Sequence, residues 1–190
     1  MFHDRRLELA RRLLDADSFM ALDVGCGGGF LSSIGLTNVI GMDVRATGAV
    51  TVRASAENLP FRDQVFDLVF AGEVLEHLNM PAQALNEWVR VLRDRGRLGL
   101  STPNGRLVGL EGNCPEHKHV FTARDLKKSL IRRGINQVMV KSIFFGSVSG
   151  RRLFQLLPLK SLKVFLLHLP VPSTLSYDLF LAGVKDPDAS

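Results

Sequence analysis

The feature that most constrains this chain is a run of glycines directly behind a short apolar segment. The apolar residues Phe19–Val24 lead into Gly25, Cys26 and then three further glycines, Gly27–Gly29. A glycine bend behind a buried strand lets the backbone approach a ligand closely, and a helix that starts after the bend offers free N–H groups. The pattern predicts a strand, a ligand-binding loop and a helix in that order.

The spacing of the glycines and the acids around them narrows the class of ligand. A dinucleotide fingerprint needs Gly or Ala at the sixth position counted from Gly25, where this chain has Phe30. The phosphate-binding pattern G-x-x-x-x-G-K-[ST] is absent from the sequence. Asp23 precedes the loop, and Asp43 follows the next apolar segment, where a carboxylate can accept hydrogen bonds from a ribose diol.

The rest of the chain alternates between short apolar runs and helical patterns. Such alternation predicts an α/β fold, a Rossmann-like and mainly parallel sheet flanked by helices. Pro81 suits a first helical turn, Gly96 a helix C-terminal cap and Thr122 an N-terminal cap, with Gly134 ending that helix. We expect helices at 5–14, 81–93 and 122–133, and strands at 19–24, 38–42, 49–54, 65–71, 97–101, 137–143 and 179–184.

We expect a single domain over residues 1–190, with an apolar and basic insertion at 146–176 before the last strand. That insertion mixes leucines and phenylalanines with basic residues and is broken by Pro158, Pro170 and Pro172. Three interpretations stay open: short helices packed on the domain, a hydrophobic lid over the substrate, or a patch that touches a membrane surface peripherally.

Charge is distributed unevenly along the chain, whose net charge is +5. From Lys118 to Lys163 the basic residues are opposed by a single acid, Asp125. This segment either attracts anions such as phosphate, anionic lipid or nucleic acid, or forms a solvated basic face. The chain has only two cysteines, and no apolar run is long enough to span a membrane, so we expect a cytoplasmic protein.

Several ordered motifs between about residues 20 and 134 resemble one family. They are Leu22–Gly29, Glu57–Phe61, Phe66–Val69, Glu73–Leu78, Arg90–Leu92 and Ser101–Asn104. Together they resemble the class I S-adenosylmethionine-dependent methyltransferases, in the type 11 small-molecule subgroup that includes quinone-biosynthesis enzymes. The resemblance implies the class I fold with an antiparallel last strand, S-adenosyl-L-methionine as cofactor, and methyl transfer to a small or lipid-like acceptor.

The resemblance also implies roles for individual residues. The methionine part of the cofactor would be held by Asp23, Gly25, Cys26, Gly27 and Gly29, and the ribose hydroxyls by Asp43. The adenine would lie beside Ala56 and Glu57, with the sulfonium against the backbone of Ala71 and Gly72. Ser55 stands where relatives usually carry an acid, and a neutral hydrogen bond to the adenine would be weaker. The segments after Gly29 and after Asp43 are shorter than is usual in the family.

Methyl transfer from a sulfonium needs little side-chain chemistry, because alignment of the reacting atoms supplies most of the rate. If a base is needed, His77 is the first candidate, with a structural role beside Glu76 as the alternative. We expect His117 and His119 to line the substrate pocket. The spacing Cys114-x-x-His117-x-His119 bunches three ligands without a distant fourth, so we expect no metal site.

Two other functions stay open at this point. The basic C-terminal half favours an RNA methyltransferase, but the basic stretch has no aromatic platform for stacking bases, which disfavours nucleic acid as a partner. The shortened loops are compatible with a catalytically lapsed partner subunit. Our preferred acceptor is a hydrophobic molecule with an anionic head, and the oligomeric state is not predicted.

Overall fold

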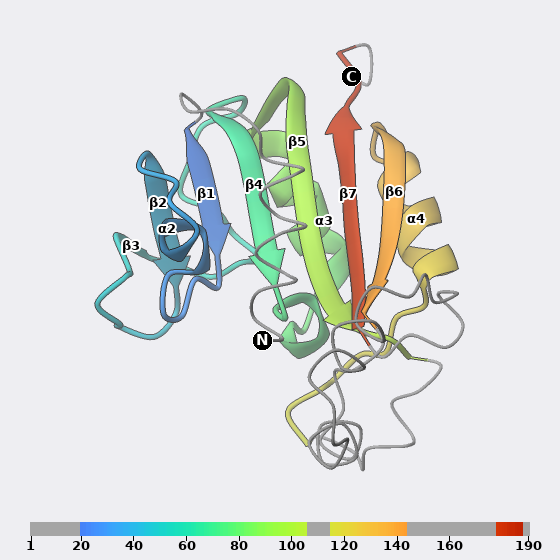
Figure 1. Cartoon of the computed structure of the whole chain (residues 1–190), viewed down its shortest axis with the longest axis horizontal. Helices are drawn as coiled ribbons and strands as arrows, with labels where there is room; N and C mark the ends of the chain where they lie inside the picture. Colours follow the sequence, from blue (N-terminus) through green and yellow to red (C-terminus); the bar gives the residue numbers. More distant parts are fainter. Residues whose placement is uncertain (1–19, 106–114, 144–177, 188–190) are drawn as a thin grey trace, which may run out of the picture.

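The computed structural model describes residues 20–105, 115–143 and 178–187. The expected helix at 5–14, the insertion at 146–176 and Cys114 lie outside these ranges. The described residues form a seven-stranded sheet in the order β3-β2-β1-β4-β5-β7-β6 (Figure 1). Its strands are β1 (Ala21–Val24), β2 (Val39–Asp43), β3 (Val52–Arg53), β4 (Phe66–Gly72), β5 (Leu92–Pro103), β6 (Ile135–Ile143) and β7 (Asp178–Lys185).

The direction of the strands confirms the predicted fold class. Strands β1 to β5 pair in parallel, whereas β7 pairs antiparallel with both β5 and β6. The last strand is therefore inserted antiparallel between two strands that share the direction of the rest of the sheet. A mainly parallel sheet of this kind needs apolar cover on both faces.

Helices pack against the sheet on both faces, and the alternation of side chains along each strand decides which face each residue meets. The helices are α2 (Phe30–Ser33), α3 (Pro81–Val91) and α4 (Ala123–Ile131), with a 3-10 turn, η1 (Leu75–His77). Figure 1 shows α3 and α4 behind the sheet and α2 in front of it. Leu22 packs in the core on the α3 side, while Ala21 packs with Leu31 of α2.

The helix boundaries confirm the predicted Thr122 cap and the predicted place of Pro81, and they correct one predicted cap. The Oγ1 atom of Thr122 accepts a hydrogen bond from the Asp125 amide at 3.2 Å, and Pro81 lies in the first turn of α3. Gly96 is not a helix cap, so that prediction is wrong. Helix α3 ends at Val91 because Leu92 already pairs with Phe66 as the start of β5, which is longer than the predicted 97–101.

The third predicted strand, at 49–54, is reduced to two residues. Only Val52 and Arg53 find partners, Met42 and Asp43, because β2 ends there. No helix forms between β2 and β3, and α2 has four residues, as the short connecting segments lead one to expect.

The topology brings several loops to one edge of the sheet. Strands β1, β2 and β4 are parallel and adjacent, so their carboxyl ends lie at the same edge. The chain leaves β1 toward β2 on one side and returns in β4 on the other, which makes the β1–β4 boundary a topological switch point. Ligands of open α/β sheets bind in the crevice outside the carboxyl ends at such a point.

One buried side chain connects the core to this edge. Trp88 of α3 is fully buried, and its indole N–H donates to the carbonyl oxygen of Ala56 at 3.0 Å. We expect Trp88→Phe to lower the free energy of unfolding by roughly 2–3 kcal/mol, because it loses core volume and leaves a buried carbonyl unpaired. Urea unfolding followed by circular dichroism measures this, and an unchanged midpoint would contradict it.

Candidate functional site

The loop after β1 adopts a conformation that favours glycine. Gly25 and Gly27 have φ angles of +64° and +47°, in the left-handed region. A Cβ on Gly25 would also lie 2.4 Å from Cγ2 of Val74, far inside van der Waals contact. The loop can therefore pass close to the chain that follows β4 only because Gly25 has no side chain.

The same loop is joined to the end of β2 by polar contacts. The Gly27 amide donates to Oδ2 of Asp43 at 3.1 Å, and the Arg45 amide donates to Oδ1 of the same carboxylate at 2.9 Å. The Thr47 hydroxyl donates to the carbonyl oxygen of Gly27. Asp43 is thus held at the tip of β2, against the glycine loop, with both of its oxygens oriented.

Asp23 is more buried than Asp43, and its carboxylate is bound by the backbone at the start of α2. Its side chain is 2% exposed, and Oδ2 accepts a hydrogen bond from the Leu31 amide at 3.1 Å, which ties β1 to the start of α2. Burial raises the pKa of Asp23 to about 6, the nearby charge of Asp43 adds to the rise, and the Leu31 hydrogen bond opposes it. The carboxylate charge at this position therefore opposes folding near neutral pH.

An open cavity of about 630 Å³ lies at the carboxyl edge, within the usual range for small-molecule sites. Its wall combines acids, bases and apolar side chains from the loops after β1, β2, β3 and β4, and from the segment that precedes α4. The lining residues are Gly25, Gly27, Met42, Asp43, Val44, Arg45, Thr47, Ala54, Ser55, Ala56, Glu73, Val74, His77, Leu78, Glu116 and Lys118.

A second, smaller cavity of about 100 Å³ shares Gly25 with the first. Its lining includes the buried Asp23 and the hydroxyl-bearing Ser101, together with Cys26, Phe30, Phe70 and Gly72.

The structure brings together most of the predicted cofactor residues. The larger cavity gathers Gly25, Gly27, Asp43, Ser55 and Ala56, and the smaller one gathers Asp23, Cys26 and Gly72.

Three predicted residues line neither cavity. Ala71 is buried within β4, and Gly29 caps the start of α2. The Glu57 carboxylate points to the start of α3, where it accepts from the Met80 amide at 2.7 Å. That position suits a negative charge because a helix N-terminus carries unpaired N–H groups.

The hydroxyl of Ser55 retains some capacity for a ligand. Its Oγ accepts a hydrogen bond from the Glu57 amide at 3.2 Å. A hydroxyl oxygen has two acceptor lone pairs, so Ser55 can accept one more hydrogen bond in the cavity.

His77 lies in the cavity wall, and its ring is oriented by the segment before α4. Its Nδ1 is 3.0 Å from the carbonyl oxygen of Glu116; because a carbonyl only accepts, Nδ1 carries the proton and Nε2 remains an acceptor. The amides of Lys118 and His119 donate to the Glu76 carbonyl at 2.8 and 3.1 Å, which fixes this segment over η1.

The two histidines predicted for the substrate pocket lie near it without lining it. The lining comes instead from their neighbours Glu116 and Lys118. The His117 ring packs edge-on against His77 with centroids 4.9 Å apart, whereas the His119 ring lies 6.0 Å from that of Phe121.

Two acidic residues of the cavity, Glu73 and Glu116, were missed by reasoning from the sequence. Glu73 has a φ of +56°, uncommon for a residue with a side chain, and its Oε1 accepts from the Ser101 hydroxyl at 2.7 Å. Its place in the motif Glu73–Leu78 was the available signal. Arg45 and Thr47 offered no comparable signal, because they lie in a segment without a motif.

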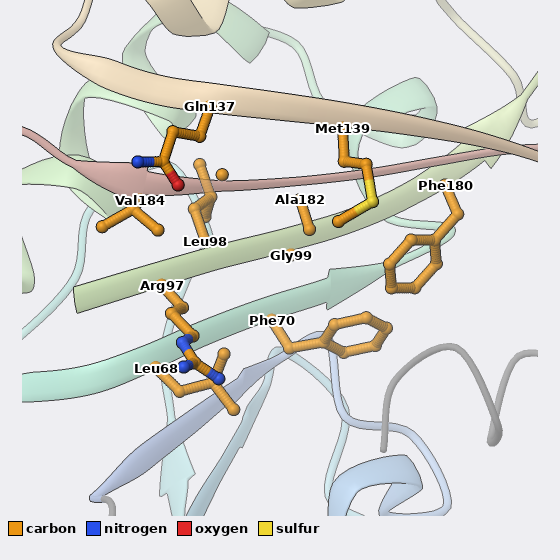
Figure 2. Close-up of a pocket in the computed structure, with 11 residues that line it drawn as sticks. Leu68, Phe70, Arg97, Leu98, Gly99, Gln137, Met139, Phe180, Ala182 and Val184 are labelled. Carbon is orange, nitrogen blue, oxygen red and sulfur yellow. The ribbon is translucent and has the colours of Figure 1, made fainter. Parts of the chain in front are cut away.

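A further cavity, of about 230 Å³, lies on a face of the sheet over β4, β5, β6 and β7 (Figure 2). The rings of Phe70 and Phe180 bound one end, and Met139 and Gln137 project into it from β6. Among the described residues that line this cavity, Arg97 is the one charged residue, and none is an acid or a histidine such as those at the carboxyl edge.

Comparisons with known proteins agree with this arrangement. Residues 22–100 match the model of a methyltransferase domain family. A "Probable S-adenosylmethionine-dependent methyltransferase" of Mycobacterium tuberculosis is 32% identical over 142 residues, which cover 66% of this chain and 52% of that protein. The mitochondrial ubiquinone biosynthesis O-methyltransferase of Saccharomyces cerevisiae is 27% identical, over 83% of this chain and 55% of its own length.

Among solved structures, an S-adenosylmethionine-dependent methyltransferase from Thermotoga maritima has a TM-score of 0.71 with 18% identity, over 97% of this chain and 92% of that one. This likeness concerns the fold. The resemblance to class I methyltransferases expected from the motifs is confirmed, although the chain spans about half the length of the curated relatives above. In the described part of the chain, no helix is long and apolar enough to cross a membrane.

The conformation at Gly25 leads to a first prediction for the site. We expect Gly25→Ala to lower the free energy of unfolding by at least about 1–2 kcal/mol, because of its left-handed φ and the contact with Val74. Chemical denaturation measures this, with Gly28→Ala as the matched control, since a Cβ there meets nothing within 4 Å. Adding Val74→Ala should restore part of the loss; if it restores none, the Val74 contact is not the cause.

A second prediction follows from the pKa of Asp23, which rises from 3.8 to about 6 on folding. The unfolded carboxyl loses its proton more readily, so the penalty is full above pH 6 and disappears as the pH falls toward 3.8. We expect wild type to gain about 1 kcal/mol of stability relative to Asp23→Asn between about pH 7.5 and about pH 5. Paired denaturant titrations at the two pH values test this, and a constant difference would refute it.

Proposed function

We propose that this chain, with a methyltransferase domain at residues 22–100, binds S-adenosylmethionine at the carboxyl edge of its sheet and transfers its methyl group to a small-molecule acceptor. The observation that carries the proposal is the Asp43 carboxylate, held at the end of β2 against the glycine loop and facing the cavity. The methyltransferase relatives support the cofactor, because their names state that they use S-adenosylmethionine.

Asp43 is suited to bind the ribose of the cofactor. Each oxygen of its carboxylate already accepts one backbone hydrogen bond, from Gly27 or Arg45. A carboxylate oxygen has a second lone pair, so both oxygens can accept from a vicinal diol while the backbone holds them in place. Ser55 and Ala56, which also line the cavity, would then lie near the adenine.

The charges of the cavity favour a cationic sulfonium. Asp43, Glu73 and Glu116 line the wall together with Arg45 and Lys118, and Asp23 lines the smaller cavity that shares Gly25. A positive sulfur near several carboxylates is stabilised by Coulomb attraction, more strongly where water is partly excluded. The methionine end of the cofactor would therefore lie toward Gly25 and Glu73.

For the acceptor we propose a hydrophobic molecule with an anionic head. Val44, Val74 and Leu78 supply apolar wall in the larger cavity, and Lys118 carries a positive charge there. The Lys118 Nζ donates to Oδ1 of Asn79 at 2.8 Å, which holds the charge near the cavity. The ubiquinone biosynthesis O-methyltransferases among the relatives support a small-molecule acceptor of this kind.

Alignment of the acceptor with the methyl group would supply most of the rate, and His77 would remove the acceptor proton. The bond from its Nδ1 to Glu116 leaves Nε2 with a lone pair for that purpose. His77 is then the catalytic residue, and Glu116 is a positioning residue that acts through its carbonyl oxygen.

The ribose contact is tested by removing one carboxylate. We expect Asp43→Ala to weaken binding of S-adenosylhomocysteine by about tenfold or more, because hydrogen bonds to a charged group contribute about 1.5–3 kcal/mol. Isothermal titration calorimetry measures the affinity, and the exposed Asp94→Ala is the control that should bind like wild type. If Asp43→Ala kept wild-type affinity, the ribose assignment would be wrong.

The same titration separates the proposal from a lapsed partner subunit. A lapsed chain with a damaged cofactor site would show no heat with S-adenosylhomocysteine, and wild type would gain no thermal stability from it. We expect wild type to bind and to be stabilised, and absence of both effects would overturn the proposed function.

A further inference from the structure

We propose that three residues between β2 and β3 clamp the glycine loop in the conformation that binds the cofactor. They are Thr47, Ala49 and Thr51, which we call the loop clamp, and Thr47 is its positioning residue. This role rests on the proposed function, because the clamp acts on the loop that would hold S-adenosylmethionine.

The glycine loop needs support from outside, because the helix that follows it is short. Helix α2 has four residues, Phe30–Ser33, which is about one turn. A single turn is marginal by itself, since forming it fixes several residues for one hydrogen bond. Three residues of the loop, Gly25, Gly27 and Gly29, have a left-handed φ, and glycine adopts many other conformations as readily. Contacts from another segment must therefore hold the loop in place.

Both polar backbone groups of Gly27 are held by the chain that follows β2. Its amide donates to Oδ2 of Asp43 at 3.1 Å, and its carbonyl oxygen accepts from the hydroxyl of Thr47. The two contacts act on the peptide bonds before and after Gly27, so together they fix its φ of +47°. Without the Thr47 hydroxyl, the peptide bond after Gly27 could rotate while its amide still faced Asp43.

Ala49 lies directly against two glycines. A Cβ on Gly41 of β2 would lie 2.2 Å from the carbonyl oxygen of Ala49, and a Cβ on Gly29 would lie 2.8 Å from the Cβ of Ala49. Both distances are below van der Waals contact, so the clamp can approach the sheet and the loop this closely only because both residues are glycine. Gly29 lines neither cavity, and its contact with Ala49 gives it a place in the cofactor site.

Two further contacts attach the clamp to the sheet and to the loop. The amide of Thr51 donates to the carbonyl oxygen of Gly41 at 2.8 Å, which ties the clamp to β2. The thiol of Cys26, in the glycine loop, lies 3.8 Å from the carbonyl oxygen of Ala49, a weak hydrogen bond. The clamp therefore joins β2 to the glycine loop by backbone contacts, and Thr47 adds a side-chain hydrogen bond.

Thr47 faces the larger cavity together with Gly25, Gly27 and Asp43. Its side chain is exposed, so in the ligand-free protein water competes for its hydrogen bond to Gly27. A bound cofactor would exclude this water, and a hydrogen bond is stronger where water is excluded. We therefore expect Thr47 to contribute more to cofactor affinity than to the stability of the ligand-free fold.

Binding of S-adenosylhomocysteine to the full chain tests the clamp. Thr47→Val keeps the shape of the side chain and removes its hydroxyl. We expect it to weaken the affinity by about three- to tenfold in isothermal titration calorimetry, the range of one lost hydrogen bond. Thr47→Ser keeps the hydroxyl and should bind almost as wild type does. The exposed Thr37→Val is the matched control and should have wild-type affinity.

A second variant tests the clamp without changing Thr47. Gly41→Ala forces the carbonyl of Ala49 away from β2, so it should weaken the affinity at least as much as Thr47→Val does. Its matched control is Gly48→Ala, where an added Cβ meets nothing within 4 Å. Should Gly41→Ala fail to fold, the Thr47 variants decide alone. Wild-type affinity in Thr47→Val, or an equal loss in Thr47→Ser or in a control, would overturn the proposal.

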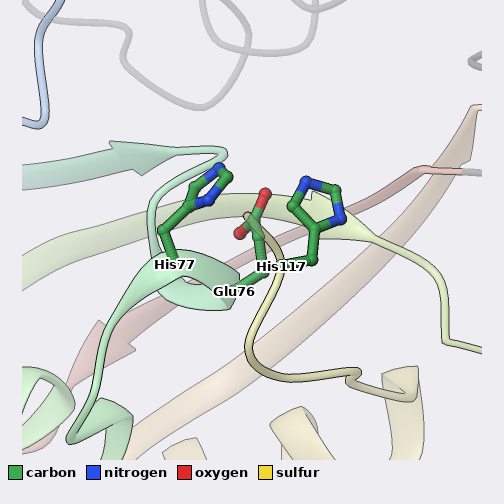
Figure 3. A group of neighbouring side chains, drawn as sticks. All are labelled: Glu76, His77 and His117. Atoms are coloured by element: carbon green, nitrogen blue, oxygen red, sulfur yellow. The ribbon is translucent and has the colours of Figure 1, made fainter. Parts of the chain in front are cut away.

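Amide exchange in the ligand-free protein separates the clamp from the proposed function. In NMR measurements we expect Thr47→Val to speed exchange of the Gly27 amide by about three- to tenfold, and Thr47→Ser to leave it unchanged. The rings of His77 and His117 lie beside the Glu76 carboxylate (Figure 3), in parts of the chain that follow β4 and precede α4. Their signals should keep their wild-type positions in Thr47→Val, which shows that the change is confined to the loop.

The two measurements fail in different ways. Unchanged exchange of the Gly27 amide in Thr47→Val would overturn the clamp even if wild type binds S-adenosylhomocysteine. Faster exchange in Thr47→Val, in a protein whose wild type does not bind S-adenosylhomocysteine, would refute the proposed function and the role of the clamp in it.

Discussion

The hydrogen bond from the Gly27 amide to the Asp43 carboxylate is the contact on which the rest of the site depends. It joins the loop after β1 to the end of β2, so the glycine bend and the acid occupy one space although 16 residues separate them. The contact is available because β1 and β2 are adjacent and parallel, with Val24 opposite Met42. A carboxylate that accepts a backbone N–H is both oriented and partly satisfied, and its other lone pairs face the cavity.

A second group of residues that shapes the site lies after β4 in the chain and in the segment before α4. Glu73 follows β4, η1 carries Glu76 and His77, and the segment before α4 is bound to η1 through the Glu76 carbonyl. The cavity therefore has one wall built from β1 and β2 and another built from β4 and the segment before α4. The acids of both walls, Asp43 in the first and Glu73 and Glu116 in the second, suit a cation, and His77 in the second wall suits a proton acceptor.

Predictions from the sequence were correct where a local pattern allowed only one structural interpretation. The glycine bend, the acid at the end of β2 and the Thr122 cap were predicted because each depends on the backbone within a few residues. The Gly96 cap was wrong, because pairing of Leu92 with Phe66 ends α3 earlier than its helical pattern suggests. Glu57 was expected to lie beside the adenine. Its carboxylate instead accepts a hydrogen bond from the Met80 amide at the start of α3.

The sequence by itself determined the order of strands and helices, the glycine bend and the two acids that flank it, because periodicity and glycine conformation are local properties of the chain. Only the tertiary structure decided which polar groups meet. It placed Asp23 in the core against α2, and it left one oxygen of Glu76 buried beside His77 and His117. Burial and the pairing of distant side chains depend on how the strands pack, and no stretch of sequence records that packing.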